Sequence, residues 1–192
     1  DFDPNAVATT SRLKQELKDS NNWVVKQGSV LDKSFMENLG KFDFVYSWGV
    51  LHHTGSVWSA ISNTCDLVST DGKFYVALYS HDVQPRADYW LKIKRTYVSS
   101  GPIKKFLMEQ AYLYRSVFWR LYLRYLSSVL KKEKGRGRGM ELMTDVRDWL
   151  GGWPMEFVYD ADVEKFICDK GFTMLNIKKG EACTEFLFRK IN

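Results

Sequence analysis

Cysteine is scarce in this chain and long apolar runs are missing from it. The three cysteines, Cys65, Cys168 and Cys183, are far apart and show no Cys-x-x-Cys spacing, which argues against a disulfide framework and a zinc knuckle. No run of about 20 apolar residues occurs, and the first residues form neither a basic start nor an apolar signal segment. These absences predict a soluble protein of the reducing cytoplasm.

The chain is rich in aromatic residues and contains one strongly basic segment. Its 192 residues are 45% hydrophobic and 15% aromatic, enough apolar surface to offset the entropy of ordering one domain. Residues 91–140 hold thirteen Lys and Arg against two Glu, a local charge of +11, whereas the whole chain carries only +5. The basic character is therefore confined to one segment.

Helical and extended patterns alternate along the first 80 residues. Asp3 and Pro4 predict the start of a helix that runs to Lys18. Short apolar runs predict strands at residues 23–25, 42–47 and 73–79, with a short helix at 34–39 and a longer one at 57–68. This alternation predicts an α/β fold with a Rossmann-like, mostly parallel sheet.

The pattern changes after residue 80. Residues 86–150 read as successive helices, broken at residues 100–102 and at the Lys- and Gly-rich tract 131–139, so we expect an inserted helical cap with a loop at that tract. Asp160 predicts the start of another helix that stops at Gly171, and residues 173–177 and 185–188 predict an antiparallel strand pair. We therefore expect a core at residues 1–80, a cap at 81–159, and a segment at 160–192 that completes the core.

The residues that follow the strands are the candidates for function, because ligands of such sheets bind beyond the carboxyl ends of the strands. Asp1 stands where a carboxylate at a strand tip would accept hydrogen bonds from ribose hydroxyls. Residues 28–32 and 46–55 follow the next two strands, and the latter segment contains His52 and His53. Adjacent histidines on a helix point about 100° apart and no other ligand is at suitable spacing, so we expect no metal site.

Four motifs together resemble one enzyme family. They are Asp-x-Asp-Pro before the first helix, Gly-Ser-Val-x-Asp after the first strand, Phe-Asp-Phe-Val-Tyr-Ser-Trp-Gly-Val-Leu-His-His-Thr at the second, and Asp-Gly-Lys-Phe before the third. In combination they resemble the class I S-adenosylmethionine-dependent methyltransferases, most closely the small-molecule branch that includes quinone-biosynthesis methylases. The resemblance covers residues 1–80 well and the two closing strands moderately.

The resemblance implies S-adenosylmethionine as the cofactor and assigns residues to it. Asp1 matches the residue that holds the ribose, Ser29 and Val30 match the segment at the adenine edge, and Ser47 with Trp48 match the strand end beside the methionine moiety. Phe2, next to Asp1, belongs to the same predicted set. His52 matches the position facing the substrate pocket and is the predicted general base, whereas we expect His53 to pack inward.

One family feature is missing from the front of the chain. The glycine-rich turn after the family's first strand does not precede Asp1, so the sequence resembles a methyltransferase truncated at its N-terminus and lacking its first two strands. The loss would leave open hydrogen-bonding edges. We expect the strand at 23–25 to move over and pair with the strand at 42–47, or a second copy to cover that edge.

The helix predicted from 103 to 130 has an apolar stripe at spacings of three and four residues. The stripe comprises Leu107, Ala111, Tyr114, Phe118, Tyr122, Tyr125 and Val129. We expect it to face a core, with a hydrophobic substrate lid, an anionic lipid surface and a nucleic-acid surface as alternatives. Nucleic-acid methylation is disfavoured because Ser47-Trp48-Gly49-Val50 lacks the prolines that such enzymes show there.

The function predicted from the sequence is S-adenosylmethionine-dependent methyl transfer to a small, hydrophobic acceptor. The alternative is a non-catalytic fragment or an oligomerising binding module without a complete cofactor site. The predicted partners are a small-molecule methyl acceptor and a second copy paired along the strand edges, with no nucleic acid expected. Contact between the basic cap and a membrane surface is a further alternative.

Overall fold

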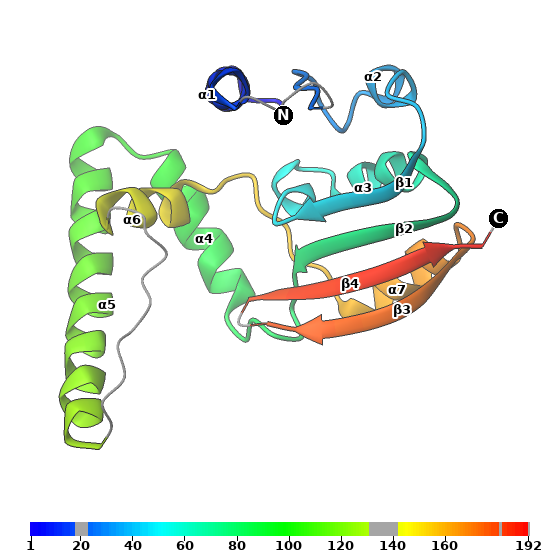
Figure 1. Ribbon diagram of the computed structural model, residues 1–192. Coiled ribbons are helices and arrows are strands. Elements are labelled where there is room, and N and C mark those ends of the chain that lie inside the picture. The colour runs from blue at the N-terminus through cyan, green and yellow to red at the C-terminus, as the bar shows by residue number, and fades with distance from the viewer. Residues whose placement is uncertain (18–22, 131–141, 181, 192) are drawn as a thin grey trace. The chain divides into compact units, whose positions relative to one another are not determined.

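The computed structural model describes residues 1–17, 23–130, 142–180 and 182–191 (Figure 1). The chain forms two compact units. Unit 1 comprises Asp1–Pro85 and Glu156–Asn192, and unit 2 comprises Arg86–Met155. The loop predicted at 131–139 lies outside the described residues.

Unit 1 contains a four-stranded sheet in the order β1-β2-β4-β3. Its strands are β1 (Phe42–Trp48), β2 (Val68–Tyr79), β3 (Phe172–Lys179) and β4 (Cys183–Lys190). β1 runs parallel to β2, whereas β4 pairs antiparallel with both β2 and β3. The predicted α/β class and C-terminal antiparallel pair are thereby confirmed.

Five short helical elements complete unit 1. They are α1 (Pro4–Glu16), α2 (Lys33–Glu37), the 3-10 helix η1 (Leu51–His53), α3 (Val57–Cys65) and α7 (Asp160–Cys168). Asp3 begins α1 as predicted, because its carboxylate accepts the Asn5 N–H at 2.9 Å. Gly171 follows α7 with a φ of 85°, a conformation that favours glycine after a helix.

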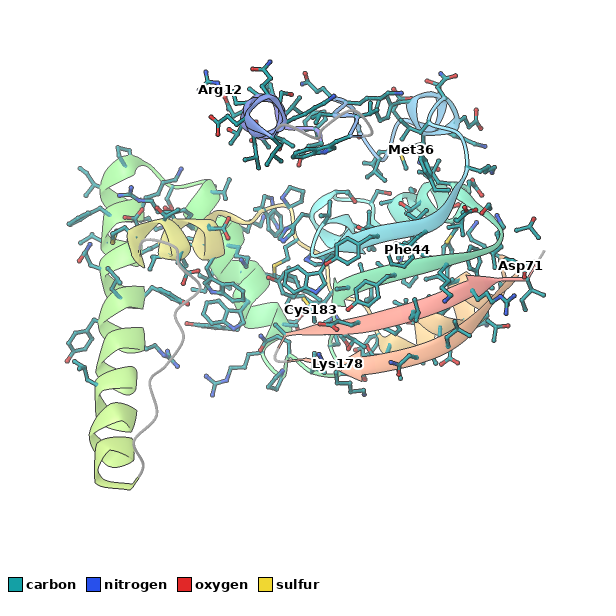
Figure 2. All side chains as sticks on the ribbon, in the orientation of Figure 1. Arg12, Met36, Phe44, Asp71, Lys178 and Cys183 are labelled. Carbon is teal, nitrogen blue, oxygen red and sulfur yellow. The ribbon has the colours of Figure 1, made fainter. Side chains whose placement is uncertain are left out.

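The two faces of the sheet differ because strand side chains alternate. Phe74, Val76 and Leu78 of β2 are fully buried, and they pack with α3, α7 and β4 in the core of unit 1. On β1 the other alternate positions are exposed: Phe44 by 55%, Tyr46 by 63% and Trp48 by 47%. Figure 2 shows Phe44 on this strand. One face is thus a core, and the other presents aromatic side chains.

The prediction for residues 23–25 was wrong. They form no strand, and β1 pairs only with β2 among the described strands. The apolar run is too short to replace a full edge strand, and Val24 is 69% exposed. β2, by contrast, begins at Val68, before its predicted start. Its pairing with β1 shifts register between Val68 and Lys73, where Asp71 has a positive φ of 63°, and regular pairing with both neighbours starts at Lys73.

The described residues of unit 2 form three helices, α4 (Ala87–Val98), α5 (Pro102–Leu130) and α6 (Leu142–Gly151). Its core is small, with Tyr97 of α4 packing against Val146 and Leu150 of α6. Partly buried residues of α5, among them Met108 and Leu113, pack against this core.

Buried polar groups supplement the small apolar core of unit 2. Glu109 of α5 is only 5% exposed; its carboxylate accepts the Tyr97 hydroxyl at 2.7 Å and the Arg147 Nε–H at 3.2 Å. The Tyr97 hydrogen bond, followed by the Arg147 contacts, holds the pKa of Glu109 below its usual range. Lys94, 1% exposed, donates to the Trp149 carbonyl, and its Nζ lies 4.2 Å from the centre of the Trp149 ring.

The orientation predicted for α5 was wrong over its described side chains. Leu107 and Tyr114, members of the predicted stripe, are 60% and 73% exposed. Met108 and Leu113, outside the stripe, make the core contacts instead. The stripe side chains from 118 onward lie outside the described set. No helix in the described part of the chain is both long and apolar enough to cross a membrane.

The buried Lys94 predicts a pH dependence of stability. Burial lowers the pKa of Lys94 to about 8 from 10.5, so between these values the unfolded chain binds more protons than the folded one. The free energy of unfolding should therefore rise with pH across this window, by up to about 3 kcal/mol. Urea unfolding between pH 7.5 and about 10, compared with Lys94→Met, measures this effect.

Tyrosines ionise near the top of this pH window, which lowers the free energy of unfolding there. Because this effect is common to wild type and Lys94→Met, the difference between the two proteins removes it. Lys92→Met, at an exposed position of the same helix, is the matched control and should keep the wild-type slope. An equal slope in wild type and Lys94→Met would contradict the prediction.

Candidate functional site

Asp1 and Phe2 lie against residues 26–28, which follow the run at 23–25 that was predicted to be a strand. The Asp1 ammonium group donates to the Lys26 carbonyl at 3.1 Å, and the Gly28 N–H donates to the Asp1 carbonyl at 2.9 Å. The Phe2 carbonyl accepts the Gln27 side-chain N–H at 3.3 Å. The structure thus brings the predicted ribose-binding residue next to the predicted adenine-edge segment.

Ser29 and Val30 are fixed by the turn that leads into α2. The Ser29 hydroxyl accepts the Leu31 N–H at 3.1 Å, and the Val30 carbonyl accepts the Asn63 amide of α3 at 2.9 Å. The Phe35 ring packs directly on Gly28, since a Cβ added there would lie 2.2 Å from the ring Cζ and the ring would have to shift. The turn therefore has a defined position relative to both α2 and α3.

Asp32 begins α2. Its carboxylate accepts the Phe35 N–H at 3.1 Å and the Ser34 hydroxyl at 2.8 Å. These bonds, the Phe35 N–H first, lower the pKa of Asp32. Its role is that of a helix N-cap, which the Gly-Ser-Val-x-Asp motif also fits.

Ser47 and Trp48 end β1 on opposite faces of the sheet. Ser47 is 9% exposed, whereas Trp48 lies on the aromatic face. On that face Tyr75 stacks on Tyr46 with ring centres 5.3 Å apart and donates its hydroxyl to Glu185 at 2.7 Å. The hydrogen bond with Tyr75 lowers the pKa of Glu185 most, and the one with Trp48 lowers it further. The same bond to Glu185 raises the pKa of Tyr75 to about 12.

The relative exposure of the two histidines is the reverse of the predicted one. His52 is fully buried, and its Nδ1 accepts the Tyr79 N–H at 3.2 Å. A neutral imidazole that accepts at Nδ1 carries its proton on Nε2. His53 is half-buried. The catalytic role of His52 stays a prediction, but the geometry makes His53 the more accessible imidazole.

Six aromatic rings meet at the carboxyl ends of β1 and β2, and we call them the strand-end ring cluster. They are His52, His53, Tyr79, His81, Phe157 and Tyr159. Tyr79 is central, with ring centres 4.1 Å from His52 and 5.6 Å from Phe157. His81 lies 5.4 Å from Phe157 and stacks on Tyr159 at 4.7 Å. The ring contacts run continuously from the fully buried His52 to Tyr159, which is 54% exposed, at the end of the sheet where ligands of such folds bind.

Polar contacts hold the two chain segments that form the ring cluster. The Ser80 hydroxyl donates to Asp160 at 2.6 Å, and the Asp160 N–H donates to Asp82 at 2.8 Å. Lys179 adds an ion pair to Asp160 at 3.3 Å. Residues 80–82 are thereby joined to the start of α7, which explains how Tyr159 comes to lie beside His81.

Glu156 ties the same region to η1 and α3. Its N–H donates to the His52 carbonyl at 2.8 Å, and its carboxylate accepts the Val57 N–H at 2.9 Å, in place of a cap from Ser56. Burial raises the pKa of Glu156 despite this bond. The side chain thus caps α3 from a position 99 residues away.

The predicted site residues fall into two groups of contacts. Asp1 and Phe2 contact residues 26–28, directly before Ser29 and Val30, whereas Ser47 and Trp48 end the strand that leads to the ring cluster. Sequence reasoning missed His81, although it follows the strand ending at Tyr79 and could have been found by that signal. It also missed Glu156, Phe157 and Tyr159, for which no local pattern exists.

Comparisons with known proteins bear on the fold. No family model matches the chain, and no curated protein matches it. Among solved structures, PKMT2 from Rickettsia typhi in complex with AdoHcy superposes with a TM-score of 0.63 at 12% identity, covering 99% of this chain and 43% of that one.

Two further structures agree with this result. An O-methyltransferase family protein from Burkholderia thailandensis gives a TM-score of 0.52 at 12% identity, over 95% of this chain and 40% of that one. Magnesium protoporphyrin IX methyltransferase from Synechocystis PCC 6803, solved with bound SAM, gives 0.50 at 12% identity, over 99% and 57%. The chain has the class I methyltransferase fold, and it spans about half the length of these proteins.

Removing the Glu156 cap should destabilise unit 1. Glu156→Ala leaves the Val57 N–H at the start of α3 without its acceptor, and we expect a loss of about 1 kcal/mol in the free energy of unfolding. Urea denaturation followed by circular dichroism measures it. Glu156→Gln retains an acceptor oxygen and should lose less; equal stability of wild type and Glu156→Ala would show that the contact is not a cap.

Proposed function

We propose that this chain belongs to an S-adenosylmethionine-dependent methyltransferase that acts on a small, hydrophobic acceptor through an oxygen, nitrogen or carbon atom. The fold shared with methyltransferases, one of them solved with bound SAM, is the observation that supports this function most strongly. The strand-end ring cluster adds aromatic side chains, partly exposed except for His52, at the carboxyl ends of the parallel strands, where an acceptor would bind.

The residues predicted to hold the cofactor fit it in part. The Asp1 carboxylate uses Oδ1 to accept the Asp3 N–H at 2.9 Å, and an ionised carboxylate has about four lone-pair positions, so it retains capacity for ribose hydroxyls. The half-buried Ser29 and Val30 would lie at the adenine edge, and Ser47 with Trp48 beside the methionine moiety. These are the residues we assign to S-adenosylmethionine.

The bound cofactor would supply an electrophilic methyl group. This chain's own contribution is then to orient the acceptor and exclude water, which rings of the strand-end cluster are suited to do. A general base is required only for acceptors that lose a proton. His53 fits that role by its partial exposure, whereas His52 would first have to give up its bond to the Tyr79 N–H.

Isothermal calorimetry tests the cofactor assignment. We expect the 192-residue chain to bind S-adenosylmethionine with micromolar affinity, and Asp1→Asn to weaken binding about 10-fold or more, because it loses charge-assisted hydrogen bonds to the ribose. Asp3→Asn, which alters the neighbouring carboxylate at the start of α1, is the matched control and should bind as wild type does.

An absence of binding heat in the wild-type chain would contradict the proposal. It would favour the alternative function, a non-catalytic module that associates with a second copy. The observation that supports this alternative is the position of β1 at the sheet edge with exposed Phe44, Tyr46 and Trp48. Sedimentation velocity on the same sample would then have to show a dimer.

The two histidines can be separated by activity. With a panel of small phenols and amines as acceptors, we expect His53→Gln to slow release of S-adenosylhomocysteine by about 100-fold, since general bases typically contribute that much. His52→Gln should lose less turnover once its fold is verified by circular dichroism. A large loss confined to folded His52→Gln would return the base assignment to His52.

A further inference from the structure

The exposed side of α5 has an apolar surface of its own. Five large apolar side chains on this helix are more than half exposed, and we call them the outer stripe: Ile103 (79%), Phe106 (57%), Leu107 (60%), Tyr114 (73%) and Leu121 (59%). At about 100° per residue they share one side of the helix. Gln110 is also exposed on this side of the helix, so the apolar side chains lie on both sides of one polar position. Exposed apolar side chains gathered on one side of a helix are typical of a binding surface.

The outer stripe is separate from the surface by which α5 packs inside unit 2. Met108 and Leu113 pack against the core of unit 2, and the buried Glu109 is bound to Tyr97 and Arg147. Met108 and Glu109 lie on the other side of the helix, and Leu113 lies at the edge of the outer stripe beside Phe106. The helix thus has apolar side chains both toward the core of unit 2 and on its exposed side. Only one of them is needed to hold the three helices together.

The charges around the stripe identify what would cover it. Lys104 and Arg115 are exposed residues at its margin. Between residues 103 and 121 the sequence holds Lys104, Lys105, Arg115 and Arg120 against one acidic residue, Glu109, which is buried. A surface that combines apolar side chains with a basic margin complements anionic lipid, whose headgroups are negative and whose acyl region is apolar.

Two other occupants fit less well. Nucleic acid would match the positive charge, but its phosphates offer nothing to Ile103, Leu107 or Leu121. A second copy would bring an equally positive segment against this one, and the repulsion would oppose association. The charged residues that recur along α5 favour a helix lying in the plane of the membrane surface over one inserted across it.

We propose that the outer stripe of α5 binds an anionic membrane surface, with its apolar side chains in the headgroup boundary and Lys104 and Arg115 at the lipid phosphates. This inference does not depend on methyl transfer. It would place the protein where hydrophobic compounds dissolve.

Vesicle co-sedimentation tests the proposal on the full chain. We expect binding to phosphatidylcholine vesicles containing about 30% phosphatidylglycerol, and weaker binding to phosphatidylcholine alone or at raised salt. The triple variant Ile103→Ser, Leu107→Ser, Leu121→Ser should lower the partition coefficient about 10-fold or more. Because these side chains are exposed, the variant should keep the wild-type circular dichroism spectrum.

Two further variants define the contact. Leu13→Ser with Leu17→Ser removes exposed apolar side chains from the α1 region of unit 1, which are 51% and 49% exposed, and should leave vesicle binding unchanged. Lys104→Gln with Arg115→Gln should weaken binding to the anionic vesicles only.

Three outcomes would overturn the proposal. They are an absence of binding to the anionic vesicles, equal binding by the wild type and the triple Ser variant, and a dimer in sedimentation velocity that only the triple Ser variant abolishes. The last result would assign the outer stripe to a second copy. Calorimetry with S-adenosylmethionine on the triple variant should match wild type, which separates this proposal from the proposed function.

Discussion

Hydrogen bonding along both sides of β2 positions most of unit 1. β2 pairs parallel with β1 and antiparallel with β4, so its register sets where both neighbours end. One face of the strand carries Phe74, Val76 and Leu78 into the core, where α3 and α7 cover them. Its last residue, Tyr79, donates its N–H to His52 and holds the centre of the ring cluster. Core and candidate site therefore depend on the same strand, and a shift of register by one residue would disrupt both.

Unit 2 follows a different principle. Three helices share a small apolar core and also bury polar groups: Glu109 is bound to Tyr97, and Lys94 to the Trp149 carbonyl. Burying such groups without these partners would cost free energy, so the packing must keep them paired. The consequence for α5 is that its inner side is defined by Glu109 and its neighbours, which leaves the more apolar stripe on the outer side. The orientation of α5 about its own axis thus places the buried polar network on its inner side and the proposed membrane contact on its outer side.

The segments that follow the strands could be located from the sequence, because strand ends are visible as changes in local pattern. The segment from Ser47 to His53 was identified from the strand that precedes it, and the turn at Ser29 from the Gly-Ser-Val-x-Asp motif. The contacts of Glu156 and Tyr159 could not be predicted, since they join segments some 80 to 100 residues apart and depend on how α7 packs on the sheet. The exposure of His52 and His53 depends on the same packing, and sequence alone assigned it in the wrong order.

The sequence by itself determined the class of fold, the position of most helices and strands, and the antiparallel pair at the C-terminus. Local periodicity and capping residues such as Asp3 and Asp32 are sufficient for these, because each acts over a few residues. The tertiary structure alone decided whether residues 23–25 become a strand, which histidine is buried, and which side of α5 faces the core. Each of these depends on partners distant in sequence. A strand needs a neighbour to accept its hydrogen bonds. A helix with two apolar sides packs on the core with the side whose buried polar groups find partners there.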